Sequence, residues 1–147
     1  MEALNHKYNN FRKCYESLGN VIVVQEELNY IAVANPIADD LFKAGVIKHF
    51  ELAYETAWKF LKQYLADVYN HEVASPKQVF RACETYRMFP ENIVNELIML
   101  ADARNTTTHI YDQILAQEVC NSIVSHHLVF GKVIESIKIP MINDISD

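Results

Sequence analysis

The sequence predicts a single all-α domain, an antiparallel up-and-down bundle of four to five helices. Half of the 147 residues are hydrophobic, which is enough to fill a core without disulfides or a structural metal. Only three glycines and four prolines interrupt the chain, and this scarcity favours a few long helices over many short strands. Apolar residues also recur at steps of three and four, the spacing of one helix face.

The first helix is expected over residues 5–30. The side chains expected to face the core are Phe11, Tyr15, Leu18, Ile22 and Leu28. Gly19 is a weak point within this helix, because glycine loses more backbone entropy on folding than other residues. Residues 32–36, which end in a proline, are expected to be a linker.

The clearest periodic segment covers residues 47–68. Its apolar stripe is Ile47, Phe50, Tyr54, Ala57, Trp58, Leu61, Leu65 and Val68. Glu51 and Glu55 fall outside this stripe and are expected to face solvent. Asn70 can adopt the left-handed conformation that ends a helix. Asp39 and Asp40 precede the segment, where carboxylates favour the helix dipole, so we interpret them as a cap region and not as a metal site.

Three more helices complete the predicted bundle. Ser75 and Pro76 resemble an N-cap followed by a first-turn proline, and that helix is expected to end near residue 88. Pro90 starts the next helix, and Asp112 is expected to cap a final long helix that ends near residue 137. Residues 1–139 would then form one domain, and residues 140–147 a flexible C-terminal tail.

Composition excludes several classes of function. The net charge of −6 argues against a broad basic surface for nucleic acid, although one or two arginines could still form a local site. The three cysteines include no C-x-x-C pair, which suggests reduced thiols in a cytoplasmic protein. We expect no signal peptide, and no apolar run is long enough for a membrane span. Because phosphate-loop and metal-binding motifs are also missing, we expect neither a cofactor nor a metal.

Residues 102–112 do not follow the bundle pattern. Arg104, Asn105, His109 and Tyr111 surround three consecutive threonines, which are poor helix formers, so the helix is expected to break or kink here. On a straight helix Arg104 and Tyr111 would share a face, whereas His109 would lie about 140° from Arg104. A kink or a second subunit would be needed to bring Arg104 and His109 together.

A plainer interpretation of the same stretch stays open on spacing alone. Asn105 and the threonines would form a helix end and a turn. Arg104 would pair with an acid such as Asp102 or Asp112, and His109 would fill a half-buried gap. Short motifs often match by chance, so further stretches are needed to decide.

Three stretches resemble one family. Residues 103–112 are similar to the arginine-x4–6-histidine motif of HEPN domains, and more closely to the R-N-x-x-x-H-x-Y pattern of nucleotidyltransferase substrate-binding proteins. Residues 49–65 resemble the second helix of that family, and residues 75–81 its S-P-K-x-x-x-R segment. Three positions depart from the family pattern, all of them packing or turn positions: Asn70, Cys83 and Leu97.

The resemblance implies a HEPN-like bundle that is usually a two-fold homodimer and pairs with a minimal nucleotidyltransferase (MNT). It implies a toxin–antitoxin module in which the toxin is a metal-independent ribonuclease. By position, the catalytic residues would be Arg104, His109 and Asn105, and the tyrosine that receives AMP from the MNT partner would be Tyr111.

The residue types suit this chemistry. An imidazole such as that of His109 can transfer protons near neutral pH, and the guanidinium of Arg104 can bind the scissile phosphate of RNA. Asn105 can orient either group or hold the kinked backbone. In a two-fold dimer, two copies of the motif can meet and supply both an acid and a base. AMP on Tyr111 would add negative charge that repels RNA phosphates.

Two other hypotheses compete with the ribonuclease. The chain could be a non-catalytic substrate-binding subunit of a two-component nucleotidyltransferase, which its acidic balance mildly favours. It could also be a stand-alone structural bundle whose motif is only a turn, although three ordered matches argue against this. The chain lacks a Gly-Ser pair, so the transferase itself would be its partner.

Overall fold

The structure is a computed structural model that describes residues 1–109 and 112–137. Within these ranges it contains seven α-helices, one 3-10 turn and no strand. The elements are α1 (Glu2–Glu27), α2 (Asn29–Ala34), α3 (Pro36–Tyr69), α4 (Pro76–Thr85), α5 (Glu91–Thr106), η1 (Thr107–His109), α6 (Gln113–Asn121) and α7 (Ile123–Ser136). None of the described helices is long and apolar enough to cross a membrane.

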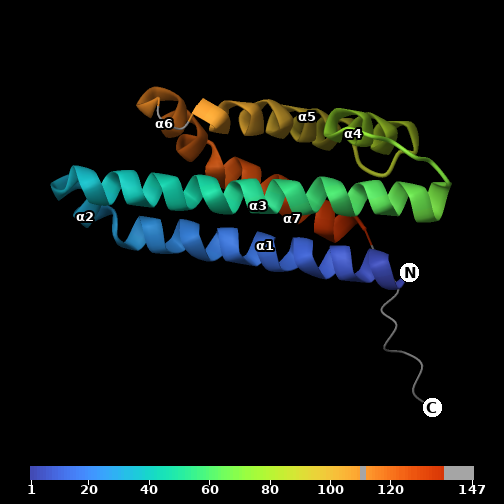
Figure 1. Cartoon of the computed structure of the whole chain (residues 1–147), viewed down its shortest axis with the longest axis horizontal. Helices are drawn as coiled ribbons and strands as arrows, with labels where there is room; N and C mark the ends of the chain where they lie inside the picture. Colours follow the sequence, from blue (N-terminus) through green and yellow to red (C-terminus); the bar gives the residue numbers. More distant parts are fainter. Residues whose placement is uncertain (110–111, 138–147) are drawn as a thin grey trace, which may run out of the picture.

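The long helix α3 lies at the centre of the bundle (Figure 1). Helix α1 packs along one side of it, and α4 and α5 lie on the other side. Helix α7 contacts α1, α3 and α5, while α2 and α6 both lie at the end where α3 begins. The predicted all-α antiparallel bundle is therefore confirmed.

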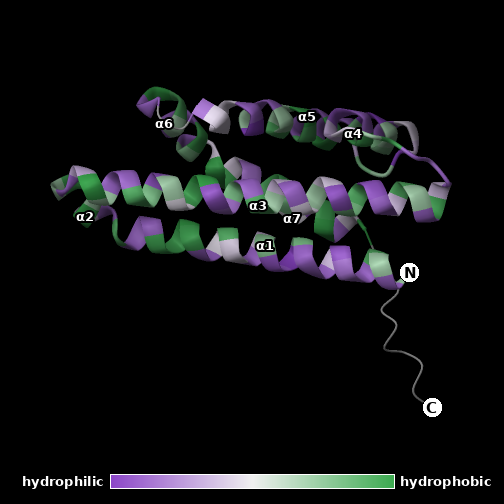
Figure 2. Cartoon of the chain, viewed as in Figure 1, coloured by the Kyte–Doolittle hydropathy of each residue, from purple (hydrophilic) through white to green (hydrophobic). Residues whose placement is uncertain are grey.

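Phenylalanines form the centre of the core. Phe11 of α1 lies 6.0 Å from both Phe60 of α3 and Phe130 of α7, measured between ring centroids. Phe50 and Phe130 lie 6.3 Å apart, and all four rings are fully buried. Aromatic contacts of this kind add to the free energy of burial, so they hold α1, α3 and α7 together. Figure 2 shows that the helices carry both hydrophobic and hydrophilic colours around their circumference.

Several predicted helix ends are confirmed. Asn70 ends α3 in the left-handed conformation, with φ 50° and ψ 40°. Ser75 and Gln78 form a capping box at the start of α4. The carboxylate of Asp112 caps α6, because it accepts hydrogen bonds from the backbone N–H of Ile114 at 2.9 Å and of Leu115 at 3.3 Å.

The predicted linker at residues 32–36 is wrong. Residues up to Ala34 belong to α2, and α3 begins at Pro36, well before the predicted residue 47. The side chain of Asn35 accepts hydrogen bonds from the backbone N–H of Ile37 and Ala38, and Pro36 occupies the first turn, where its missing N–H costs nothing. Asp39 consequently lies inside α3, where it pairs with Lys43 at 2.6 Å.

The predicted single C-terminal helix is also wrong. It divides into α6 and α7 at Ser122, whose backbone N–H bonds to Glu118 and Val119, each at 3.2 Å. No glycine or proline lies at this break, so the residue types there do not predict it. Helix α4 ends at Thr85 and not near residue 88, and Arg87 then adopts a positive φ of 51°. The predicted tail, residues 140–147, lies outside the described residues.

Candidate functional site

The end of α5 is shaped by its three threonines. Each hydroxyl donates to the carbonyl three residues earlier: Thr106 to Ala103 at 2.7 Å, Thr107 to Arg104 at 2.7 Å, and Thr108 to Asn105 at 2.8 Å. These bonds occupy the carbonyls that would otherwise continue the helix, and the chain tightens into the 3-10 turn η1. The predicted break in the helix is therefore present.

Arg104 is held by two partners from different elements. Its Nη2 lies 3.3 Å from Oε2 of Glu51 in α3, and its Nη1 donates to Oγ1 of Thr107 at 2.9 Å. The Arg104 and Glu51 side chains are 26% and 24% exposed, so the pair is only partly hydrated. The guanidinium is consequently fixed in one orientation, and Nε of Arg104 is buried without a partner among the described residues.

The plainer interpretation of this stretch is wrong in its choice of partners. Asp102 does not pair with Arg104, because its carboxylate binds Nζ of Lys77 in α4 at 2.7 Å. Asp112 instead caps α6. The partner is Glu51, which the sequence placed on a solvent face, and no local pattern connects it to Arg104, because packing of α3 against α5 brings the two residues together.

Two buried polar groups lie close to Arg104. Thr107 and Tyr54 are each 4% exposed. Burial, followed by the charge of Glu55, raises the pKa of Tyr54 to about 12, while the charge of Arg104 acts in the opposite direction. Tyr54 is therefore a neutral phenol at physiological pH, and it does not neutralise Arg104.

The other predicted site residues lie on the surface or outside the described residues. His109 is exposed at the end of η1, where its carbonyl accepts a hydrogen bond from the backbone N–H of Asp112 at 2.8 Å. Asn105 is exposed, and its carbonyl accepts the Thr108 hydroxyl. Tyr111 lies outside the described residues. The structure thus joins Arg104 to Glu51 and Thr107, and His109 and Asn105 are exposed residues.

The two histidines of α7 pack against aromatic rings. His126 and His127 are half-buried in α7, and burial lowers the pKa of both. The ring of His127 stacks on Tyr15 at 4.3 Å, and the ring of His126 lies 5.3 Å from Phe50. Within the described residues, no group of three or more acidic, histidine or cysteine side chains could hold a metal ion.

Comparisons with known proteins give a family and a fold. The chain matches the family described as nucleotidyltransferase substrate binding protein like over residues 6–138. It is 28% identical over 109 residues to the probable ribonuclease HepT of Haemophilus influenzae, covering 71% of this chain and 73% of that protein.

Two solved structures share the fold. One is a Haemophilus influenzae protein described as the substrate binding domain of a nucleotidyltransferase, with a TM-score of 0.74, 24% identity and coverage of 87% of this chain and 96% of that one. The other is a tri-AMPylated HEPN toxin of Shewanella oneidensis in complex with an MNT antitoxin, with a TM-score of 0.72, 13% identity and coverage of 92% and 96%. At these identities the likeness establishes the fold alone.

Proposed function

The chain belongs to the nucleotidyltransferase substrate-binding protein family, and we propose that it is a HEPN-type, metal-independent ribonuclease toxin that pairs with an MNT antitoxin. One observation carries this proposal. Arg104, which is held by Glu51 and Thr107 in the last turn of α5, is followed five residues later by the exposed His109 at the end of η1, and this arrangement supports the proposal. The similarity to a probable ribonuclease supports the same reading.

The proposed reaction is an internal transesterification of RNA. The 2′-oxygen forms a bond to phosphorus and the bond from phosphorus to the 5′-oxygen breaks, which leaves a 2′,3′-cyclic phosphate and a 5′-hydroxyl. A base removes the proton from the 2′-hydroxyl, and an acid protonates the leaving 5′-oxygen. His109 would carry out one of these proton transfers. Arg104 would stabilise the charge that develops on the phosphate, and Asn105 would orient these groups.

Glu51 would position Arg104 for this role. A guanidinium offers five N–H donors in a planar fork. Glu51 and Thr107 engage its two terminal nitrogens, which fixes the plane of the fork while donors remain for a phosphate. The nearby carboxylate of Glu51 also weakens the attraction of Arg104 for RNA phosphates. The ion pair therefore fixes the orientation of the guanidinium but lowers its affinity for RNA.

We propose a two-fold homodimer as the active form, because one copy of the motif supplies a single imidazole. Three exposed apolar side chains mark the surface at the end of the bundle that carries the motif: Ile37 and Leu41 of α3 are 72% and 67% exposed, and Ile114 of α6 is 72% exposed. Helix α6 contacts both α3 and η1, so this surface and the motif are neighbours. Figure 2 shows hydrophobic residues on α2 and α6 at this end of the bundle. A second copy covering this surface would bring two motifs together.

We propose that the MNT partner silences the toxin by modifying Tyr111. The phenol oxygen would form a bond to the α-phosphorus of ATP, pyrophosphate would leave, and the phenol proton would pass to a base. The likeness to an AMPylated HEPN toxin supports this step. Mass spectrometry after incubation with the cognate MNT protein and ATP should find AMP on Tyr111 and none at that position in Tyr111→Phe. An unmodified Tyr111 would contradict the proposal.

A second candidate function is a non-catalytic substrate-binding subunit of a two-component nucleotidyltransferase. The pairing of Arg104 with Glu51 favours it, because a carboxylate beside the cation proposed to bind the scissile phosphate disfavours an anionic substrate. The net charge of −6 acts in the same direction.

RNA cleavage in EDTA separates the two functions. The purified protein should cleave a mixed RNA pool, His109→Ala should be inactive, and His6→Ala should retain activity because His6 is an exposed residue of α1. The circular dichroism of each variant should match the parent, which shows that the bundle is intact. If the parent protein leaves the pool uncut, or if His109→Ala cuts it equally well, the ribonuclease proposal fails and the binding subunit replaces it.

A further inference from the structure

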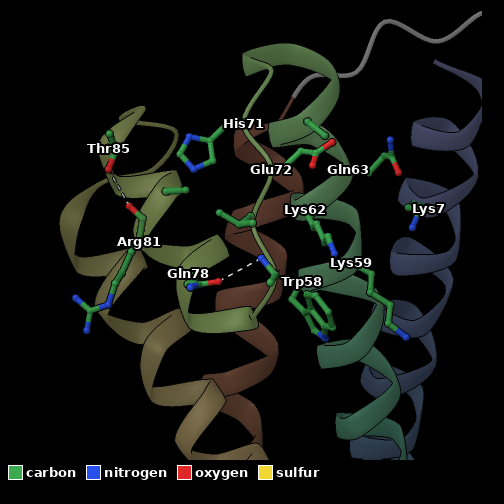
Figure 3. Close-up of a pocket in the computed structure, with 14 residues that line it drawn as sticks. Lys7, Trp58, Lys59, Lys62, Gln63, His71, Glu72, Gln78, Arg81 and Thr85 are labelled. Carbon is green, nitrogen blue, oxygen red and sulfur yellow. Dashed lines mark hydrogen bonds between the residues drawn. The ribbon is translucent and has the colours of Figure 1, made fainter.

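An open pocket of about 1160 Å³ lies at the end of the bundle where α1 begins and α3 ends (Figure 3). It is formed by α1, the C-terminal half of α3, the segment 71–74 and α4. Residues 49–65 and 75–81, the two other segments that resemble the family, contribute much of its lining, and the proposed ribonuclease chemistry uses only Glu51 from them. We call this the basic pocket, and we define it by Lys7, Trp58, Lys59, Lys62, Glu72 and Arg81.

The basic pocket differs in charge from the rest of the molecule. Four lysine or arginine side chains and a single carboxylate line it, although the whole chain has a net charge of −6. Among the described residues, no carboxylate pairs with Lys7, Lys62 or Arg81. Lys59 pairs with Glu55 at 3.4 Å. Lys7, Lys59 and Lys62 follow one side of the pocket in Figure 3, and Arg81 comes from the opposite side with its guanidinium turned outward.

Trp58 gives the pocket an aromatic surface. Its Nε1 donates to Oε2 of Glu55 at 3.1 Å, which fixes the plane of the indole, and Nζ of Lys59 lies 5.9 Å from the ring centroid. The side chain is half-buried, so part of the ring remains accessible. Aromatic rings that stack on bases, set among cations that contact phosphates, are how proteins hold single-stranded nucleic acid.

We propose that the basic pocket binds a stretch of single-stranded RNA away from the cleavage site, with a base against Trp58 and phosphates on Lys7 and Lys62. This inference rests on the proposed ribonuclease function and names how its substrate is held. Lys62 and Glu51, the partner of Arg104, lie on the same helix about three turns apart, or about 16 Å. One RNA strand running along α3 could therefore contact both the basic pocket and Arg104. The pocket would give this acidic protein a local binding site for a polyanion.

The emission of Trp58 tests this directly, because Trp58 is the single tryptophan of the chain. The probe is a 12-nucleotide single-stranded RNA of mixed sequence, added to His109→Ala protein so that the RNA stays intact. We expect saturable quenching of the tryptophan emission. The double change Lys7→Gln with Lys62→Gln should weaken binding about tenfold at 0.1 M salt. It should also reduce the slope of log affinity against log salt by about 1.4, since each phosphate contact on a single strand contributes about 0.7.

The matched control is the double change Lys13→Gln with Lys132→Gln. Both lysines are exposed and lie outside the pocket, and their loss changes the net charge by the same amount. The control should keep the affinity of the parent. Equal weakening in both double variants would overturn the proposal. So would RNA binding, seen by anisotropy of a labelled strand, that leaves Trp58 emission unchanged.

Two further arms separate other occupants of the pocket. Quenching by AMP or inorganic phosphate at the same phosphate concentration as the RNA would identify a small-anion site and overturn the proposal. Loss of MNT binding in the pocket variant with unchanged RNA binding would identify a protein interface and overturn it as well. RNA-dependent quenching by a parent protein that cuts no RNA would leave the pocket proposal standing and sink the ribonuclease. RNA cleavage by a parent protein whose Trp58 emission does not respond to RNA would support the ribonuclease and overturn the pocket proposal.

Discussion

The two cationic regions of this molecule are built in contrasting ways. At the end of α5, Arg104 is paired with Glu51, hydrogen-bonded to the buried Thr107 and 26% exposed. In the basic pocket, by contrast, Lys7, Lys62 and Arg81 have no carboxylate partners among the described residues, and the pocket is open to solvent.

The end of α5 and the basic pocket are suited to different tasks. A paired, half-buried cation has lost its freedom to move, so it suits a task that needs one geometry, such as stabilising a transition state. Unpaired surface cations keep their rotamers and their hydration, so they suit sequence-independent attraction to phosphates that fades with salt. Changes at Arg104 should therefore affect rate steeply, and changes in the basic pocket should affect affinity gradually.

The largest effect is expected from Arg104→Lys. The ammonium keeps the charge but cannot bridge Glu51 and Thr107 with a planar fork. We expect RNA cleavage to fall about 10²- to 10³-fold, the usual cost of removing one donor that stabilises a transition state. Single-turnover cleavage at saturating RNA measures it. A loss that appears only in the affinity for RNA would contradict the proposed difference between the two regions, because Arg104 would then act like the lysines of the pocket.

Thr107→Val should have the next largest effect. The change keeps the shape of the side chain but leaves Nη1 of Arg104 and the helix carbonyl without their hydroxyl partner. We expect a loss of about 1–3 kcal/mol in the free energy of unfolding, the cost of an unsatisfied buried polar group, together with slower cleavage. Urea unfolding measures the first quantity.

Thr85→Val is the matched control for this change. The Thr85 hydroxyl makes a similar bond, to the carbonyl of Arg81 at 3.2 Å, but on an exposed turn of α4. It should cost under about 0.5 kcal/mol, as surface substitutions usually do. Equal losses at the two threonines would show that the bond to Arg104 contributes nothing beyond helix termination.

The sequence predicted the fold and the break in α5 better than the contacts of the site. Spacing of apolar residues shows which face of α3 is buried, and three threonines predict the end of α5, since both are local signals. Glu51 was assigned to solvent because nothing local distinguishes it from Glu55, and only the packing of α3 against α5 makes it the partner of Arg104. The break at Ser122 was missed for a related reason, since no residue type there opposes a helix.

The half-buried histidines of α7 should make the stability of the bundle depend on pH. Burial against Phe50 lowers the pKa of His126, so the unfolded chain binds the proton more readily than the folded one. The stability contributed by the neutral ring is complete above the unfolded value near 6.5 and is lost as the pH falls below it. Urea unfolding at pH 7.5, 6.5 and 5.5 should show a falling free energy of unfolding.

His126→Gln should flatten this dependence, and His6→Gln, a change on the exposed surface, should leave it as it is in the parent protein. His127 contributes in the same direction, because burial lowers its pKa while its hydrogen bond to the Tyr15 carbonyl opposes the shift. Some slope will therefore remain in His126→Gln. An unchanged slope in that variant would show that the ring is hydrated and not part of the interior.

The smallest effect is expected from Lys77→Gln, which removes the ion pair with Asp102. This pair links α4 to α5, and Asp102 is two residues before Arg104 in the sequence. The separation of 2.7 Å between Lys77 and Asp102 is shorter than the 3.3 Å between Arg104 and Glu51. Distance alone would rank it as the stronger contact. Its side chains are 47% and 62% exposed, however, and such pairs contribute about 0.2–1 kcal/mol because water and salt screen them. We expect a change within that range by urea unfolding, and cleavage close to that of the parent. A loss as large as that of Thr107→Val would mean that separation, and not burial, distinguishes the two regions.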